Sequence, residues 1–413
     1  MERSDGVKIS LVKAKTLLSK RIEGDSWFHS NYTMNIYRGC QFACAYCDGM
    51  SEHYHVDNYT THIRVKTNAP EILKKELDKI WPDQRKKTLY DFTDGQQTDP
   101  RKPIIGISGG VSDSYQQAEK EQRVTRKVLQ VLYEKRLPVF ILTKSDLVLR
   151  DIEILKQINE TAFANVCFSI AFSENKTKQR LEPNSPSIFA RLEALKMLRS
   201  EGIRGGVMAM PIVPFIGDSH ENMREIAYHC KDHQAEFVLF SGMTLKPGRQ
   251  KKHFLRMVGK HFPDKLNDIM ACYSNNNKYG VPGEGALNPS LIGPIICEKA
   301  GIKWLSTRHC CPGEFKSNTL VLKKLLESIY LDGWLLRTPR RFWKPILDFV
   351  VQLEHGLPEV SEILASESML ERFRVSDKLR FELSEILNNG SSSRIDRLKS
   401  QVLALSCKMN AHS

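Results

Sequence analysis

The sequence lacks any uninterrupted apolar run near the roughly 18 residues that a membrane-spanning helix needs. Its first five residues, which include two carboxylates and an arginine, also lack the apolar stretch of a secretory signal. No basic tail or arm is present either, because the net charge of +13 is spread along all 413 residues. We therefore expect a cytoplasmic protein without a membrane partner.

The sequence does contain ten cysteines. Thiols stay reduced in the cytosol, so cysteines in a chain of this kind more often bind metals or carry redox chemistry than form a disulfide framework. We therefore expect thiolate ligands for a metal centre.

Two short stretches, 246–252 and 337–344, are denser in lysine and arginine than the rest of the chain. In the second stretch the cations surround Phe342 and Trp343, a combination that can pair phosphate contacts with base stacking. DNA or RNA is therefore one candidate partner. A solvated face whose aromatic rings pack inward explains the same residues and is the favoured interpretation.

Short apolar runs alternate with longer amphipathic segments between residues 33 and 241, which is typical of repeated βα units in an α/β fold. The expected strands are 33–37, 103–108, 139–143, 165–171, 207–212 and 237–240. Such a series forms either an open doubly wound sheet or a partial barrel, and the strand pattern alone does not distinguish them. The alternation then fades into a mixed region and mostly helical segments.

The most informative segment follows the first expected strand and contains Cys40, Cys44 and Cys47. Three closely spaced thiolates can bind three irons of an iron–sulfur cube and leave the fourth iron open to a small molecule. A structural zinc site is the main alternative, and it needs a fourth ligand from elsewhere. His53, His55 and His62 lie downstream and can be considered for that place.

This triplet, with Tyr46 directly before the third cysteine, resembles the signature of the radical S-adenosylmethionine (SAM) superfamily. The resemblance implies a partial (β/α)6 barrel with a mostly helical C-terminal extension. It also implies a 4Fe-4S cluster held by Cys40, Cys44 and Cys47, with SAM bound to the open iron and cleaved to a 5′-deoxyadenosyl radical. A reductant such as flavodoxin or ferredoxin is then an expected partner. We accordingly divide the chain into an N-terminal extension (1–29), a core domain (30–250) and a C-terminal region (251–413).

The resemblance also suggests SAM-binding residues beyond the cysteines. Tyr46 is expected to contact the adenine, Gly109 and Gly110 the amino group, and Ser169 with Arg180 the carboxylate. Arginine suits the last role because its guanidinium offers two parallel donors to a carboxylate. The acidic residue usual after the glycines is replaced by Val111. A surface ion pair with Glu174 or Glu182 is the alternative for Arg180.

Four segments, 108–119, 142–145, 180–183 and 210–214, resemble the spore photoproduct lyase-like branch of the superfamily. No cysteine lies between residues 103 and 119, however, and Asp48 follows the third cluster cysteine in place of a tyrosine. True spore photoproduct lyase activity is therefore not expected. Asp113 and Tyr115 are the candidates for a catalytic role, and the substrate is unidentified, with nucleic acid one candidate.

Further alternatives concern the function and a second cluster. One is a nucleic-acid-binding protein with a structural metal centre and no SAM chemistry, and another is a SAM-cleaving enzyme that acts on a peptide or small metabolite. Four later cysteines raise the question of an auxiliary cluster, although their irregular spacing disfavours it: Cys272, Cys297, Cys310 and Cys311.

Overall fold

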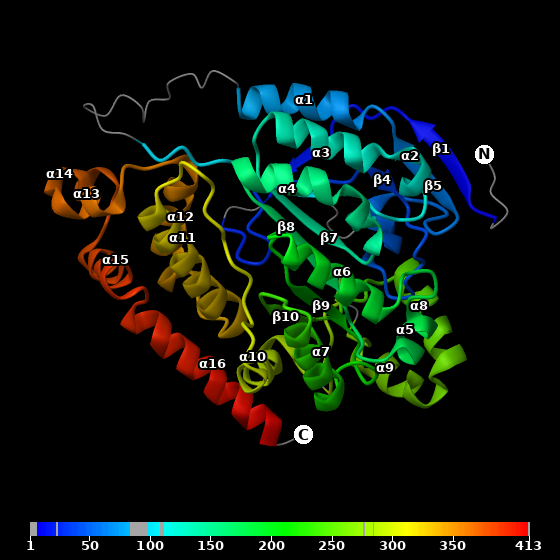
Figure 1. Ribbon diagram of the computed structural model, residues 1–413. Helices are drawn as coiled ribbons and strands as arrows, with labels where there is room; N and C mark the ends of the chain where they lie inside the picture. The colour runs from blue at the N-terminus through cyan, green and yellow to red at the C-terminus, as the bar shows by residue number, and fades with distance from the viewer. Residues whose placement is uncertain are drawn as a thin grey trace.

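The computed structural model describes most of the chain, namely residues 6–21, 24–82, 98–107, 111–275, 277–283 and 285–411. None of the helices in these ranges combines the length and the apolar character needed to cross a membrane. Strands and helices alternate in the first part of the chain and helices dominate the last part (Figure 1).

A seven-stranded sheet with the order β10-β9-β8-β7-β6-β3-β2 forms the centre of the molecule. Its neighbouring strands are parallel, except for the antiparallel pair of β2 and β3. The strands are β2 (Leu18–Lys20), β3 (Tyr32–Met34), β6 (Ile105–Ile107), β7 (Val139–Thr143), β8 (Ala164–Ser169), β9 (Val207–Ile212) and β10 (Val238–Gly242). The six parallel strands occur where the sequence predicts them.

The strand order selects the partial barrel over the doubly wound sheet. Each parallel strand pairs with the next one along the sheet, without the reversal that defines a doubly wound fold. Right-handed crossovers then place the connecting helices on one side, as Figure 1 shows for α1, α3, α4, α6 and α7. The helices up to β10 are α1 (Ala69–Ile80), α2 (Glu119–Gln122), α3 (Val124–Glu134), α4 (Ile152–Thr161), α5 (Asn175–Leu181), α6 (Ile188–Ser200) and α7 (His220–Asp232).

A second, three-stranded sheet has the order β1-β5-β4 and consists of β1 (Lys8–Val12), β5 (His62–Lys66) and β4 (Tyr37–Arg38). The first expected strand, 33–37, is thus divided: its start pairs with β6 as β3, and its end pairs with β5 as β4. The divergence carries the chain out of the central sheet directly before Cys40. Residues 1–29 contribute β1 to the small sheet and β2 to the large one.

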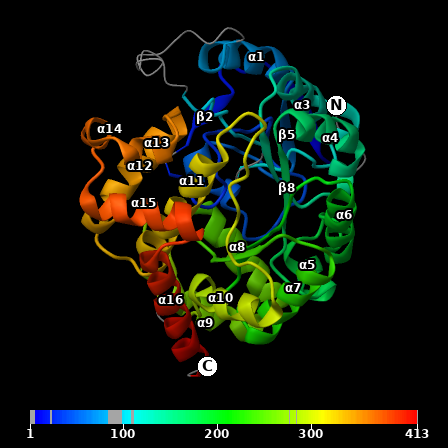
Figure 2. The same cartoon turned by 60° about the vertical axis from the view of Figure 1, so that its left-hand side comes forward.

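Helices account for most of the chain after β10. Figure 2 shows α11 to α16 gathered on one side of the molecule, away from α3, α4 and α6. These later helices are α8 (Arg249–His261), α9 (Leu266–Cys272), α10 (Pro289–Ala300), α11 (Lys316–Ile329), α12 (Lys344–His355), α13 (Val360–Ala365), α14 (Glu367–Arg372), α15 (Asp377–Asn389) and α16 (Ser393–Ala411). Short 3-10 and π segments fill several connections: η1 (Asp48–Met50), η2 (Glu52–Tyr54), η4 (Asp146–Asp151), η5 (Pro263–Lys265), η6 (Tyr330–Leu335) and η7 (Arg340–Phe342).

The segment 302–315 crosses the end of the barrel where the strands begin. The backbone N–H of Val238, at the start of β10, donates to the carbonyl of Lys303 at 2.8 Å. Farther along the segment, the Arg308 guanidinium lies 5.8 Å from the ring of Phe163, just before β8. Glu314 accepts a 3.2 Å ion pair from Arg101, just before β6. The amino-terminal end of the barrel is thus covered by this segment.

Candidate metal and cofactor site

The cysteine loop begins directly after β4 and is held in place by side chains from other segments. The backbone N–H of Gln41 donates to Gln116 at 2.9 Å, and the Gln116 amide donates to the carbonyl of Gly39 at 3.1 Å. In return, the side-chain oxygen of Gln41 accepts a 2.7 Å bond from the backbone of Ala118. These bonds brace the cysteine loop against the segment that follows β6.

Gly39 is required by the backbone at the start of this loop. Its φ of +87° lies in the left-handed region, and an added Cβ would come within 2.7 Å of the Tyr59 carbonyl oxygen and 2.8 Å of the His62 carbonyl oxygen. Both neighbours are backbone atoms that cannot rotate away. The glycine therefore lets the loop pass against the chain that leads into β5.

We expect Gly39→Ala to lower both stability and iron content. The matched control is Gly202→Ala, because Gly202 has a φ of +77° and open space around its Cβ position. The control should cost only the conformational penalty, about 1–2 kcal/mol. Gly39→Ala should cost more and should displace the cysteine loop, which can be measured by chemical denaturation and by iron content after anaerobic reconstitution. Equal effects of the two substitutions would contradict the steric role of Gly39.

The three thiols lie in a buried environment suited to a cationic iron–sulfide core. Cys40 and Cys44 are buried and Cys47 is partly buried. Burial raises the pKa of all three thiols, and the carboxyl of Asp113 near Cys40 and that of Glu182 near Cys44 raise it further. Iron binds the thiolate form and its positive charge offsets the cost of burying that form. The donor set therefore fits an iron–sulfur cluster.

Hydrogen-bond donors face the sulfur atoms. The backbone N–H groups of Phe42 and Asp113 are directed at Cys40, and that of Gly49 at Cys47. The Tyr59 hydroxyl also lies 3.1 Å from the Cys47 sulfur, although its proton is donated to the Val111 carbonyl at 2.6 Å. Such donors stabilise thiolates and tune the reduction potential of a cluster.

A buried polar network lies next to the cysteine loop at the carboxyl ends of β7 and β8. The Lys144 ammonium donates to the Ser169 hydroxyl at 2.6 Å and lies 3.1 Å from a Glu182 carboxylate oxygen. Arg191 binds the other Glu182 oxygen at 2.5 Å and the Ser169 carbonyl at 2.8 Å. The Tyr46 hydroxyl donates to Glu182. Residues from five segments thus converge beside the thiols.

The charges of this network are balanced in favour of an ionised Glu182. Burial alone would raise the pKa of its carboxyl, but Arg191 and Lys144 outweigh burial and hold that pKa well below its usual range. The Lys144 ammonium also lies 5.7 Å from the centre of the Tyr46 ring. The site therefore presents an ammonium group, a hydroxyl and an aromatic ring next to the cysteine loop.

The structure brings some of the predicted cofactor-binding residues together and separates others. Tyr46 and Ser169 both belong to the network described above. Arg180 does not: its guanidinium lies 5.2 Å from the ring of Phe262 and 3.4 Å from the carbonyl of His261, and it pairs with neither Glu174 nor Glu182. Gly109 and Gly110 lie outside the described residues.

The two candidate catalytic residues lie in different surroundings. Asp113 accepts bonds of 2.8 Å each from the Thr143 hydroxyl and from the backbone N–H of Lys144, so it ties the segment after β6 to the end of β7. Burial raises the pKa of its carboxyl. Tyr115 is fully buried and its hydroxyl donates to Asp151 at 3.2 Å. Asp113 therefore borders the site, whereas the Tyr115 hydroxyl is bound to the network behind it.

Arg191 was missed by the sequence analysis, although a signal for it exists. It lies in α6 between Ile188 and Leu192, on the side that is buried against the sheet, and its own side chain is fully buried. A cation on the apolar face of an amphipathic helix requires a buried anion, and Glu182 lies only nine residues earlier in the chain.

Two of the three histidines considered above as alternative ligands have other partners. The His62 ring lies 2.8 Å from the Ser10 hydroxyl and the His53 ring 3.0 Å from the Ser51 hydroxyl. Among the described residues no three His, Cys, Asp or Glu side chains converge on one ion position. Cluster ligands, in contrast, each bind a different iron. Among the later cysteines, the Cys297 thiol points at the Val238 carbonyl and the Cys310 thiol at the Glu314 carbonyl.

Comparison with known proteins identifies relatives of this chain. Residues 34–228 match the sequence family described as the radical SAM superfamily. An uncharacterized protein of Methanocaldococcus jannaschii is 31% identical over 264 residues, which cover 63% of this chain and 87% of that relative. An uncharacterized protein of Mycobacterium tuberculosis is 25% identical over 299 residues, covering 71% of this chain and 82% of the relative.

The matches among solved structures are more distant in sequence. Spore photoproduct lyase complexed with a dinucleoside spore photoproduct has a TM-score of 0.44 at 15% identity, over 62% of this chain and 66% of that one. A cobalamin-dependent SAM radical enzyme has a TM-score of 0.35 at 12% identity, over 92% of this chain and 54% of that one. The chain thus spans slightly less than two thirds of the first structure and about half of the second.

Proposed function

Because this chain belongs to the radical SAM superfamily, whose members use a 4Fe-4S cluster and SAM, we propose that Cys40, Cys44 and Cys47 hold its cluster and that it starts radical chemistry on a substrate. The observation that carries the proposal is the position of the triplet. All three thiols lie on one braced loop, beside the buried network that contains Lys144 and Glu182. Three thiolates leave the fourth iron of a cube without a protein ligand.

The described residues supply the remaining parts of a SAM site. Bound SAM and the reduced cluster supply the chemistry, in which an electron breaks a carbon–sulfur bond and releases methionine and a 5′-deoxyadenosyl radical. Lys144 offers an ammonium group to the carboxylate of SAM, and Tyr46 offers an aromatic ring to its adenine. The Ser169 hydroxyl donates to the Met210 carbonyl at 2.8 Å, so Ser169 can donate to the carboxylate only after its hydroxyl turns away from Met210. Arg180 can bind the SAM carboxylate only if its side chain moves away from Phe262, so we assign the carboxylate contact to Lys144.

Replacing Lys144 by methionine should weaken SAM binding by about 10- to 100-fold, because a hydrogen bond to a charged group contributes about 1.5–3 kcal/mol. Methionine keeps the length of the side chain and removes its charge. Lys176→Met, on the exposed side of α5, is the control and should leave the affinity unchanged. The dissociation constant can be measured by equilibrium dialysis with the reconstituted protein, with iron content checked in parallel. An unchanged affinity for the Lys144 variant would remove Lys144 from the SAM site.

The proposed activity is tested by anaerobic reconstitution with iron and sulfide, followed by dithionite and SAM. The expected product is 5′-deoxyadenosine, formed in an amount that depends on the loaded cluster. Tightly bound zinc without labile sulfide in anaerobically purified protein, together with no 5′-deoxyadenosine, would refute the proposal. That result would favour the alternative of a structural metal centre without SAM chemistry.

The substrate of the proposed reaction is best sought among several classes, with nucleic acid as one candidate. Asp48, which follows the third cysteine, accepts bonds of 2.7 Å from Lys246 and 2.8 Å from the Tyr54 hydroxyl, so it fastens the loop to the segment before α8. This structural role supports an activity other than that of spore photoproduct lyase. Transfer of deuterium from labelled nucleic acid, peptide or metabolite pools into 5′-deoxyadenosine would identify the substrate class. A flavodoxin or ferredoxin as electron donor and a cytoplasmic location remain predictions.

A further inference from the structure

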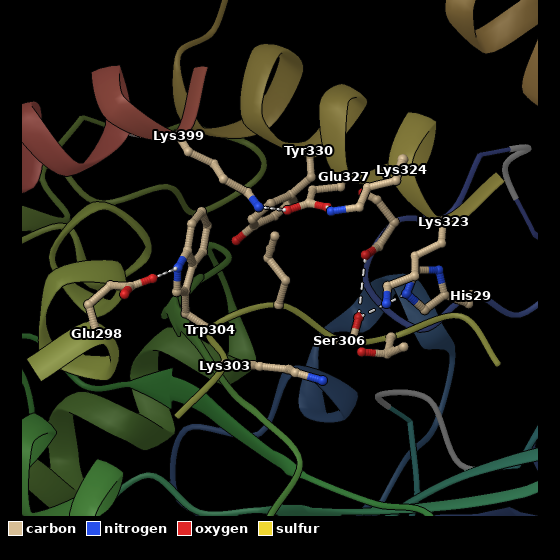
Figure 3. A pocket seen from close by; sticks show the side chains of 13 residues that line it. His29, Glu298, Lys303, Trp304, Ser306, Lys323, Lys324, Glu327, Tyr330 and Lys399 are labelled. Atoms are coloured by element: carbon tan, nitrogen blue, oxygen red, sulfur yellow. Dashed lines mark hydrogen bonds and ion pairs between the residues drawn. The ribbon is translucent and has the colours of Figure 1, made fainter. Parts of the chain in front are cut away.

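A pocket of about 230 Å³ lies at the end of the barrel opposite to the cysteine loop. Its walls come from the end of α10, the segment 302–315, helix α11 with Tyr330 after it, and helix α16 (Figure 3). Ser26 and His29, from the chain before β3, also line it. Because the segment 302–315 crosses the beginnings of the strands, this pocket is separate from the proposed SAM site.

The walls of this pocket carry an excess of positive charge. Four lysines line it, against the carboxylates of Glu298 and Glu327 (Figure 3). Glu327 is already bound to Lys324 at 3.1 Å and to Lys399 at 2.6 Å. The ammonium groups of Lys303 and Lys323 have no ion-pair partner among the residues that the structure describes. Two cations are therefore available to a ligand.

The surroundings of Lys323 show that this arrangement is electrostatically unfavourable when nothing balances it. Its side chain is half-buried, and burial is the main reason that the pKa of its ammonium group is lowered. The positive charges of Lys303 and Lys324 lower this pKa further. Glu327 only partly opposes these effects. An anion between the lysines would remove this repulsion.

A buried hydroxyl points to the same conclusion independently of the charges. Ser26 is 6% exposed, lines the pocket, and its hydroxyl oxygen has no hydrogen-bond partner in the structure. Buried polar atoms without partners are rare in folded proteins and call for an explanation. A ligand oxygen can accept a hydrogen bond from the Ser26 hydroxyl. The nearby Ser306 hydroxyl, in contrast, already donates to the Trp27 carbonyl at 2.6 Å.

The size and the remaining walls indicate a small ligand. Pockets that hold drug-sized molecules measure about 300–1,000 Å³, so 230 Å³ favours a compact molecule over a polymer. Trp304, whose indole N–H donates to Glu298 at 3.0 Å, and Tyr330 add aromatic surface beside the lysines. We infer that this pocket binds a small phosphate monoester, with Lys303, Lys323 and the Ser26 hydroxyl as its contacts to the phosphate.

The inference is tested by isothermal titration calorimetry on the full chain with ribose 5-phosphate, inorganic phosphate and ribose as probes. Ribose 5-phosphate and phosphate should bind with one site per chain, and ribose should not. In the double variant Lys303→Met and Lys323→Met the affinity should fall at least 10-fold. The matched control, Lys74→Met and Lys75→Met, removes the same charge from the exposed side of α1 and should bind as the parent does.

Several outcomes would overturn the inference. They are failure of both phosphate probes to bind at millimolar concentration, equal losses in the two double variants, and binding of a single-stranded oligonucleotide that phosphate does not compete with. Removal of two repelling cations should leave the stability of the Lys303 and Lys323 variant equal to or above that of the parent. Chemical denaturation measures this stability and thereby separates loss of binding from misfolding. The test needs no SAM turnover, so its result is independent of the proposed function.

Discussion

Replacing Cys44 by alanine should abolish both the iron–sulfur cluster and the reductive cleavage of SAM. Each cysteine of the triplet would bind a different iron, so a cube that keeps only two protein ligands loses its anchoring and opens an additional iron to solvent. Cys44 is also the thiol in the electrostatic range of Lys144 and Glu182, next to the proposed SAM site. We expect loss of labile sulfide and of 5′-deoxyadenosine formation to below detection in the reconstituted variant.

Two control substitutions separate this effect from a general sensitivity to cysteine loss. Cys297→Ala removes a fully buried thiol under β10, and Cys407→Ala removes an exposed one on α16. Both variants should keep the cluster and the activity, although Cys297→Ala will cost some stability because it leaves a small cavity. Iron and sulfide analysis with product quantification by liquid chromatography decides the question. Normal cleavage of SAM by the Cys44 variant would refute the assignment of the triplet.

The features that the sequence predicts correctly depend on local pattern. Most residues of β6 to β9 are buried, as expected for short strands covered on both faces, and β7 and β9 begin and end at the expected residues. The partial barrel with its helical extension was expected from the resemblance of the cysteine segment, and the strand order confirms it. The covalent spacing of the three cysteines already determines that they lie on one loop.

The features that the sequence did not predict depend on contacts between distant residues. Strand β5 is short, and its partners β1 and β4 lie 54 and 26 residues away in the registers Lys8 with His62 and Arg38 with Arg64. The direction of a side chain is equally hard to predict from the sequence. The position of Arg180 in a motif predicts a contact with the SAM carboxylate, but its guanidinium lies over the ring of Phe262, 82 residues later. The closure of the barrel by residues 302–315 depends on contacts of the same kind.

The second large effect concerns stability. Replacing Arg191 by methionine should destabilise the fold by about 3–5 kcal/mol, because it leaves the buried charge of Glu182 without its main partner. Both side chains are fully buried, at an N–O distance of 2.5 Å. The matched control is Lys156→Met, whose ion pair with Glu201 at 2.5 Å is about half exposed. Exposed pairs contribute little to stability because water and salt screen them, so the control should remain close to the parent in chemical denaturation.

The pH dependence of the Arg191 variant distinguishes loss of charge compensation from loss of packing. In the parent, the pKa of Glu182 lies below its unfolded value, so its stabilising contribution is present above that value and is lost only in strong acid. Without Arg191, burial dominates and raises the pKa of Glu182 in the folded state. The variant should then lose stability as the pH rises, and its deficit should be larger at pH 8 than at pH 5. Adding Glu182→Gln should recover part of this deficit, because the buried carboxylate is gone. A deficit that is independent of pH and unchanged by Glu182→Gln would show that Arg191 acts by packing alone.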